Sequence, residues 1–202
     1  MPATHTSQKI ALKTVTRIAI LTAIASILMA LDFPLPFTPP FYKFDFSDTV
    51  VLLGGFALGP VAGVTIEFLK SLINLLINGT TTAYIGEFAS FVMGCSLILP
   101  ATILYRYKKT FKSAVIGLIL STLSLTVVGS LLNYFVMIPA YSHFYHMEIE
   151  KIVNMGNAVN SLVKDLKTLI VFAVAPFNLV KGIASSVINL LLYKRLSKIL
   201  HI

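Results

Sequence analysis

Four polar side chains recur at helical spacing within the apolar segment 61–78. They are Glu67, Lys70, Asn74 and Asn78. At about 100° per residue these positions fall within an arc of about 80°, so they share one face of a helix. A second apolar segment, 168–193, repeats the pattern. Its polar members are Asn178, Lys181, Ser185 and Asn189. Charged groups inside apolar helices must be paired or hydrated, so the two polar faces predict a shared polar cavity.

Simpler interpretations exist for parts of this pattern. Glu67 and Lys70 could form an i,i+3 ion pair that neutralises itself. Asn78 and Asn189 could cap helix ends or lie exposed at the membrane surface.

Lys181 and Asn133 are expected at a similar depth near the outer ends of their helices. Lys181 follows Pro176, which we take as the outer start of its helix, and it has no acidic residue nearby in sequence. Snorkelling of the ammonium to the surface is the alternative. The Asn133 amide offers donors and an acceptor, as an imide edge requires, although such an amide can also bond a neighbouring helix.

The composition indicates that these residues are held by membrane-spanning helices. Of 202 residues, 56% are hydrophobic and 12% are charged, and the mean hydropathy is +0.86. Apolar runs near 20 residues match about 30 Å of hydrocarbon. We expect an all-α polytopic bundle of six transmembrane helices that forms a single integral-membrane domain over 1–202. The predicted helices are 11–31, 47–59, 61–78, 85–105, 113–138 and 168–193.

The basic residues predict the topology of the bundle. They cluster before the first span, between the fourth and fifth spans, and after the sixth span. With six spans these clusters share one face, which the positive-inside rule makes cytoplasmic, together with both termini. We therefore interpret the net charge of +8 as a topology signal and predict no nucleic-acid partner.

Two connections have unusual composition. The loop 31–44 holds four prolines among aromatic residues, which predicts a stiff non-helical spacer or lid. The outer segment 139–167 places apolar residues near helical spacing among charges, a pattern typical of a helix in the membrane interface. The second span, 47–59, is short and rich in glycine, which predicts burial or tilt rather than absence.

The first span, 11–31, carries two features of its own. Its basic start resembles a signal peptide, but 32–36 offer no clear cleavage pattern, so we expect an uncleaved helix. Ala19 and Ala23 form a small-x-x-x-small step, which allows another helix to approach closely. Internal packing of the bundle would explain the same step.

Catalytic chemistry has little support in the sequence. Cys95 is the only cysteine and lies in an apolar run, so we predict neither a disulfide nor a thiolate metal site. His143, His146 and Glu148 could ligate a metal, but they lie in an aromatic-rich outer loop of the kind found at membrane interfaces. No phosphate-binding loop or catalytic triad motif is present. We predict neither an enzyme nor a resident cofactor.

Four segments of the chain are similar to one family of transport proteins. They are Leu-Asp-Phe-Pro-Leu-Pro-Phe at 31–37, Lys-Phe-Asp-Phe-Ser-Asp at 43–48, Gly-Phe-Ala-Leu-Gly-Pro-Val-Ala-Gly at 55–63 and Pro-Phe-Asn-Leu-Val-Lys-Gly at 176–182. The chain resembles the riboflavin-specific substrate-binding subunits, or S components, of energy-coupling factor (ECF) vitamin transporters. The first and last segments are fairly specific to the riboflavin branch.

The resemblance implies a function in the bacterial plasma membrane. Such a subunit binds extracellular riboflavin under the first loop and docks on an energising module of one transmembrane coupling subunit and two ATPases. The family's coupling-subunit contact matches Ala19 and Ala23. Its flavin-contacting Asn and Lys match Asn133 and Lys181. Riboflavin is then the transported ligand, and membrane lipid surrounds the protein.

The polar faces suggest further roles in such a site. Aromatic side chains could cover the ring faces of a flavin. The candidates are Phe41, Tyr42, Tyr84 and Tyr141. Glu67, Lys70 and Asn74 could bond the ribityl hydroxyls, and Asn178 belongs to the same cavity. The alternatives are the same fold with a flavin nucleotide or another vitamin, an intramembrane enzyme that uses His143, and a structural scaffold.

Overall fold

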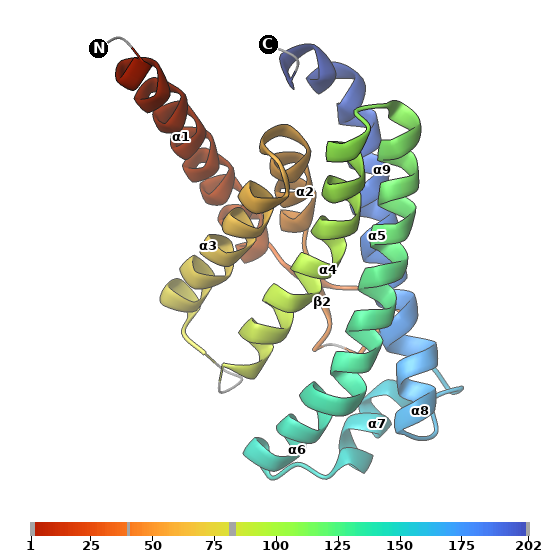
Figure 1. Ribbon diagram of the computed structural model, residues 1–202. Helices are drawn as coiled ribbons and strands as arrows, with labels where there is room; N and C mark the ends of the chain where they lie inside the picture. Colours follow the sequence, from red (N-terminus) through yellow and green to blue (C-terminus); the bar gives the residue numbers. More distant parts are fainter. Residues whose placement is uncertain (1–2, 40, 81–83, 201–202) are drawn as a thin grey trace.

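The computed structural model describes residues 3–39, 41–80 and 84–200, and it is a bundle of long helices (Figure 1). Five helical segments are long and apolar enough to cross a membrane, at Leu12–Ala30, Pro60–Asn78, Ile85–Tyr107, Phe111–Tyr145 and Leu166–Leu192. They belong to α1 (Ala3–Ala30), α3 (Pro60–Asn78), α4 (Ile85–Tyr107), the stretch that begins with α5 (Phe111–Leu132), and the stretch that ends with α9 (Ala175–Leu200). Together with the shorter α2 (Ser47–Leu58), they confirm the expected all-α membrane bundle.

The second helix reaches only part of the way across. α2 has 12 residues, or about 18 Å of rise, against about 30 Å of hydrocarbon. The preceding loop contains a small antiparallel ladder of β1 (Phe33–Pro34) and β2 (Lys43–Phe44). Tyr42 and Phe44 of this loop are buried in a core cluster with α9. The loop is therefore packed against the bundle through these two side chains and is not a detached spacer.

The glycines of α2 serve close helix packing. A Cβ on Gly63 of α3 would lie 3.1 Å from the Gly55 Cα, so these helices meet backbone to backbone. Gly59 between them has φ +99°, a conformation that glycine adopts without strain, and Pro60 then begins α3. The glycines that lower the helix propensity of this segment also bury it, which agrees with the predicted burial of a short span.

Two of the long helices contain π-helical turns that precede prolines. η1 (Asn133–Met137) joins α5 to α6 (Ile138–Tyr145), and η2 (Ile170–Val174) joins α8 (Leu166–Leu169) to α9. Pro176 removes the donor that the Phe172 carbonyl would use, and the Asn160 Nδ2 donates to that carbonyl instead at 3.3 Å. The expectation that Pro176 starts the sixth span is wrong, because the π turn lets the helix continue through it.

The segment 139–167 also differs from its prediction. It contains the end of α6 and the helix α7 (Ile149–Asn157), and Ile152 and Val153 on α7 are buried together with Val163. They pack against Leu169 and Ile170, near the start of the sixth span. The bundle itself therefore covers the apolar residues of α7, whereas Val159 and Leu162 of the same predicted pattern lie beyond α7 and are 40% and 55% exposed.

The chain ends are on one side of the molecule. The start of α1, the α4–α5 connection and the end of α9 lie at the same end of the bundle, opposite α6, α7 and α8 (Figure 1). The three basic clusters of the sequence fall in these segments. The three basic clusters therefore lie on one side, as expected from an even number of spans.

Candidate functional site

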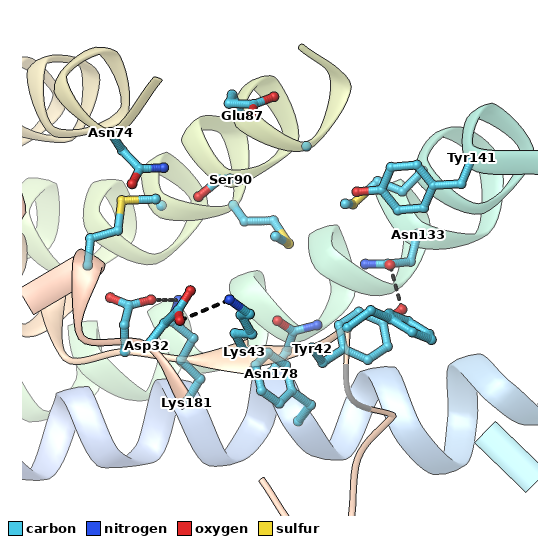
Figure 2. Close-up of a pocket in the computed structure, with 18 of the residues that line it drawn as sticks. Asp32, Tyr42, Lys43, Asn74, Glu87, Ser90, Asn133, Tyr141, Asn178 and Lys181 are labelled. Atoms are coloured by element: carbon cyan, nitrogen blue, oxygen red, sulfur yellow. Dashed lines mark hydrogen bonds and ion pairs between the residues drawn. The ribbon is translucent and has the colours of Figure 1, made fainter. Parts of the chain in front are cut away.

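A cavity of about 900 Å³ lies between the loop before α2 and the halves of α3, α4, α5 and α9 that are remote from the start of α1 and the end of α9 (Figure 2). Its size is that of a site for a drug-sized ligand. Seven residues predicted for the site line it: Phe41, Tyr42, Asn74, Asn133, Tyr141, Asn178 and Lys181. The two polar helix faces thus meet at one cavity, as their spacing predicted.

One wall of the cavity is built from an alternating series of charges, which we call the ion chain. Its members, in spatial order, are Asp45, Lys181, Asp48, Lys70 and Glu67. The Lys181 Nζ lies 3.2 Å from the Asp45 Oδ2 and 3.0 Å from the Asp48 Oδ2. Lys181 is therefore ion-paired across the bundle, and snorkelling does not describe it.

The inner part of the ion chain is sealed from solvent. The Lys70 Nζ lies 2.8 Å from the Asp48 Oδ1 and 2.7 Å from the Glu67 Oε2. The side chains of Lys70 and Glu67 are 1% and 0% exposed. The predicted i,i+3 pair exists, but it is not self-contained, because Lys70 also binds Asp48 of α2.

The start of α2 fixes the two aspartates. Asp48 lies in the first turn of α2, where a carboxylate is stabilised by the helix dipole. The Ser47 backbone N–H donates to the Asp45 Oδ1 at 2.8 Å, and the Ser47 hydroxyl donates to the same oxygen. Lys70 donates to the Ser47 Oγ at 3.1 Å, so α3 holds this turn in place.

The other end of the cavity is formed by amides and aromatic rings. The Tyr42 hydroxyl donates to the Asn133 Oδ1 at 2.7 Å, and the Asn133 Nδ2 donates to the Gly129 carbonyl of its own helix at 2.8 Å. The Tyr42 ring lies 5.5 Å from the Phe177 ring, centroid to centroid. Burial, with a smaller contribution from Tyr141, raises the pKa of Tyr42, so its hydroxyl stays protonated and donates at neutral pH.

Asn178 lies between these two ends (Figure 2). Its Nδ2 donates to the Val174 carbonyl at 3.1 Å, and the side chain is buried where Gly129 of α5 leaves room for it. An amide with two donors and one oxygen keeps bonding capacity after this single bond. The α9 wall therefore presents an amide and an ammonium one turn apart.

Several predicted residues lie away from the cavity wall. Glu67 and Lys70 are buried behind Asp48, and Tyr84 is 64% exposed at the start of α4. Asn189 is neither a cap nor exposed, because its buried Nδ2 donates to the Thr49 carbonyl of α2 at 3.1 Å. Asn78 is exposed at the cavity rim and donates to the Asn74 Oδ1 at 2.7 Å.

The first helix presents its alanine step to the outside. Ala19 and Ala23 are exposed, and only 11% of the most apolar stretch of α1 is buried, against 33–44% in the other four long segments. α1 splays away from the rest of the bundle at its N-terminal end (Figure 1). Internal packing therefore does not account for this step.

The main residues that sequence reasoning missed are acidic. Asp32, Asp45, Asp48 and Glu87 line the cavity, and none belongs to a polar helical face. Asp45 and Asp48 lie within the segment Lys-Phe-Asp-Phe-Ser-Asp, just where an apolar helix begins. Acidic residues at the start of an apolar helix could have predicted that Lys181 has ion-pair partners.

The arrangement is suited to binding rather than to catalysis. No group of three or more potential metal-ligating side chains occurs within 12–192, leaving aside the undescribed 40 and 81–83. The Asn133 and Asn178 amides, the Lys181 ammonium and the aromatic surfaces beside them fit a planar ligand with a polar edge. A flat ring system with both donors and acceptors is the class of molecule that this wall can recognise.

Comparison with known proteins gives a consistent result. Residues 13–193 match the family described as ECF transporter, substrate-specific component. The Riboflavin transporter RibU of Staphylococcus aureus is 40% identical over 91% of this chain and 89% of that protein. The Riboflavin transporter FmnP of Bacillus subtilis is 33% identical over 89% of each chain. A solved S component of a bacterial ECF transporter aligns with a TM-score of 0.71 and 37% identity, covering 93% of this chain and 97% of that one.

Proposed function

This chain belongs to the family of ECF transporter substrate-specific components, and from that membership we propose that it is a riboflavin-binding transport subunit. It binds riboflavin from outside the cell and delivers it for ATP-driven uptake. The observation that carries the proposal is the cavity of about 900 Å³ in a chain whose relatives are named riboflavin transporters. The chain is a transport component, one integral-membrane domain over 1–202, and not an enzyme.

The isoalloxazine ring fits the amide and aromatic end of the cavity. After its bonds to Gly129 and Tyr42, the Asn133 amide retains one N–H and one acceptor position for a ligand. Asn178 and Lys181 continue the polar wall along α9 (Figure 2). These three residues bond the imide edge of the flavin, while Phe41, Tyr42 and Tyr141 cover its apolar faces.

The ribityl chain lies toward the opposite wall. Asn74 faces the cavity from α3, near Glu87 and Ser90 of α4 (Figure 2). These groups provide donors and acceptors for hydroxyls. Glu67 and Lys70 act on the ligand only through Asp48, because both lie behind the wall.

The energising module docks along α1. Its exposed alanine step at Ala19 and Ala23 offers a flat surface for another helix, and the low burial of α1 leaves that surface open. The partner is a transmembrane coupling subunit with two ATPases. Both termini are cytoplasmic in the bacterial plasma membrane, since the basic clusters gather at the end of the bundle that holds them.

Purified protein tests the proposal directly. We expect protein isolated from riboflavin-containing cells to be yellow and to bind riboflavin with an affinity tighter than micromolar. Asn133→Ala and Lys181→Ala should each cost about 1–3 kcal/mol of binding free energy, because each removes a buried polar partner. Asn154→Ala, an exposed amide on α7, is the matched control. A colourless protein without submicromolar flavin affinity refutes the function, and tighter binding of phosphorylated flavins reassigns the ligand.

A further inference from the structure

The ion chain contains an odd number of charges. Its ionised members are three carboxylates, on Asp45, Asp48 and Glu67, and two ammonium groups, on Lys70 and Lys181. Two positive and three negative charges leave a formal charge of −1. An uncompensated charge is expensive at this depth, because the surrounding helices and lipid solvate it poorly.

The three carboxylates are not equivalent. Asp48 lies between two ammonium groups, at 2.8 Å from the Lys70 Nζ and 3.0 Å from the Lys181 Nζ. Asp45 contacts Lys181, accepts two hydrogen bonds from Ser47, and lines the cavity. Both aspartates are therefore stabilised as anions from several directions.

Glu67 has much weaker support for a negative charge. Its single cationic partner is Lys70, which it shares with Asp48. Neither of its carboxyl oxygens has a hydrogen-bond partner among the described residues, although the Oε2 lies 2.7 Å from the Lys70 Nζ, and its side chain is 0% exposed. The carboxyl group packs on Gly94 of α4, where any larger side chain would collide with it. The group is at the inner end of the ion chain and does not line the cavity.

Within the described residues, the neighbouring helices supply no cation to Glu67 from outside the ion chain. Lys70 faces it from α3, and Asp48 of α2 and Lys181 of α9 act on it from farther along the ion chain. On α4 the titratable neighbour is the Cys95 thiol, which is not cationic. A bound proton is the smallest change that neutralises the set.

We propose that Glu67 is a proton-binding site, with the proton held on its Oε1 while the Oε2 stays next to the Lys70 ammonium. Taking one proton from water converts the carboxylate to a carboxylic acid and brings the ion chain to zero net charge. Lys70 then pairs as a cation with Asp48 alone. The ion chain, once neutral, holds Lys181 at the cavity wall without a buried excess charge. This inference does not depend on the identity of the transported ligand.

Two isosteric substitutions separate the protonated carboxyl from the ionised ones. Glu67→Gln resembles the protonated acid, so we expect the thermal midpoint of the ligand-free protein to move by less than about 2 °C. Asp48→Asn removes an anion shared by two lysines and should lower the midpoint by about 6 °C or more. Equal, large decreases of the thermal midpoint in both variants overturn the proposal, because they show that the ion chain needs a negative charge on Glu67.

Spectroscopy on the unmodified protein gives a second measurement that does not require a variant to fold. The chain has four glutamates, at 67, 87, 148 and 150. With carbon-13 at the glutamate side-chain carboxyls, we expect one signal at neutral pH in the range of a protonated acid, and its loss in Glu67→Gln. Four carboxylate signals, or an acid signal that persists in Glu67→Gln, overturn the assignment.

Discussion

The two ends of the cavity hold polar groups by different physical means. At the ionic end, the ion chain is closed by salt bridges that join the loop before α2, α2 itself, α3 and α9. At the amide and aromatic end, one hydrogen bond joins Tyr42 to Asn133, and the Tyr42 ring packs against the Phe177 ring. Removing a lysine or an aspartate from the ionic end leaves a buried charge, whereas removing a group at the other end leaves a neutral group.

This difference assigns the two ends different tasks. The ionic end stabilises the bundle, because its salt bridges to Asp45 and Asp48 join elements that are distant in sequence, and the loss of a lysine or an aspartate leaves a charge without its partner. The amide end keeps unused donors and acceptors, which a ligand can occupy without breaking the fold. A site that must both hold its shape and exchange its ligand benefits from this separation.

The largest expected effect is at the centre of the ionic end. Lys70→Met leaves Glu67 and Asp48 without their shared cation, so we expect a loss of about 3–5 kcal/mol in the free energy of unfolding. Denaturation of the purified protein in detergent measures it. Lys151→Met, on the exposed surface of α7, is the control and should change little. A loss below about 1 kcal/mol for Lys70→Met would show that the two ends do not differ as described.

A smaller effect is expected at the amide end. Tyr42→Phe keeps the ring against Phe177 but removes the hydrogen bond to the Asn133 Oδ1, so the free energy of unfolding should fall by about 0.5–1.5 kcal/mol. The same denaturation assay on ligand-free protein measures it. Tyr107→Phe at the exposed end of α4 serves as the control. If Tyr42→Phe lowered the free energy of unfolding as much as Lys70→Met, the amide and aromatic end would stabilise the bundle as much as the ionic end does.

The smallest effect is expected for the ion pair in the hairpin of the first loop. The Lys43 Nζ lies 3.1 Å from the Asp32 Oδ1, but the two side chains are 56% and 35% exposed. Lys43→Met should therefore reduce stability by about 1 kcal/mol or less, and by less still in high salt. Comparing its unfolding at low and high salt with that of Lys70→Met isolates the contribution of burial. A large loss of stability that does not depend on salt would show that this pair behaves like the buried pairs of the ion chain.

The sequence predicted most of the architecture, for reasons of local periodicity. The polar faces of 61–78 and 168–193 have fixed angular spacing, and the structure brings both to one cavity. Charge clusters between apolar runs predicted the even-numbered helix path. The predictions failed where a nonlocal contact replaces a local one. Asn160 compensates for Pro176, and Leu169 and Ile170 bury the apolar face of α7.

What the sequence determined alone is the membrane bundle, its helix order and the inward polar faces, because each depends on composition and spacing within one segment. What only the tertiary structure decided is the partnership of the charges. Asp45 is 136 residues from Lys181, and Asp48 is 22 residues from Lys70, and no local pattern links them. An ion pair depends on distance in space, so the ion chain and its odd carboxylate appear only when α2, α3 and α9 are packed together.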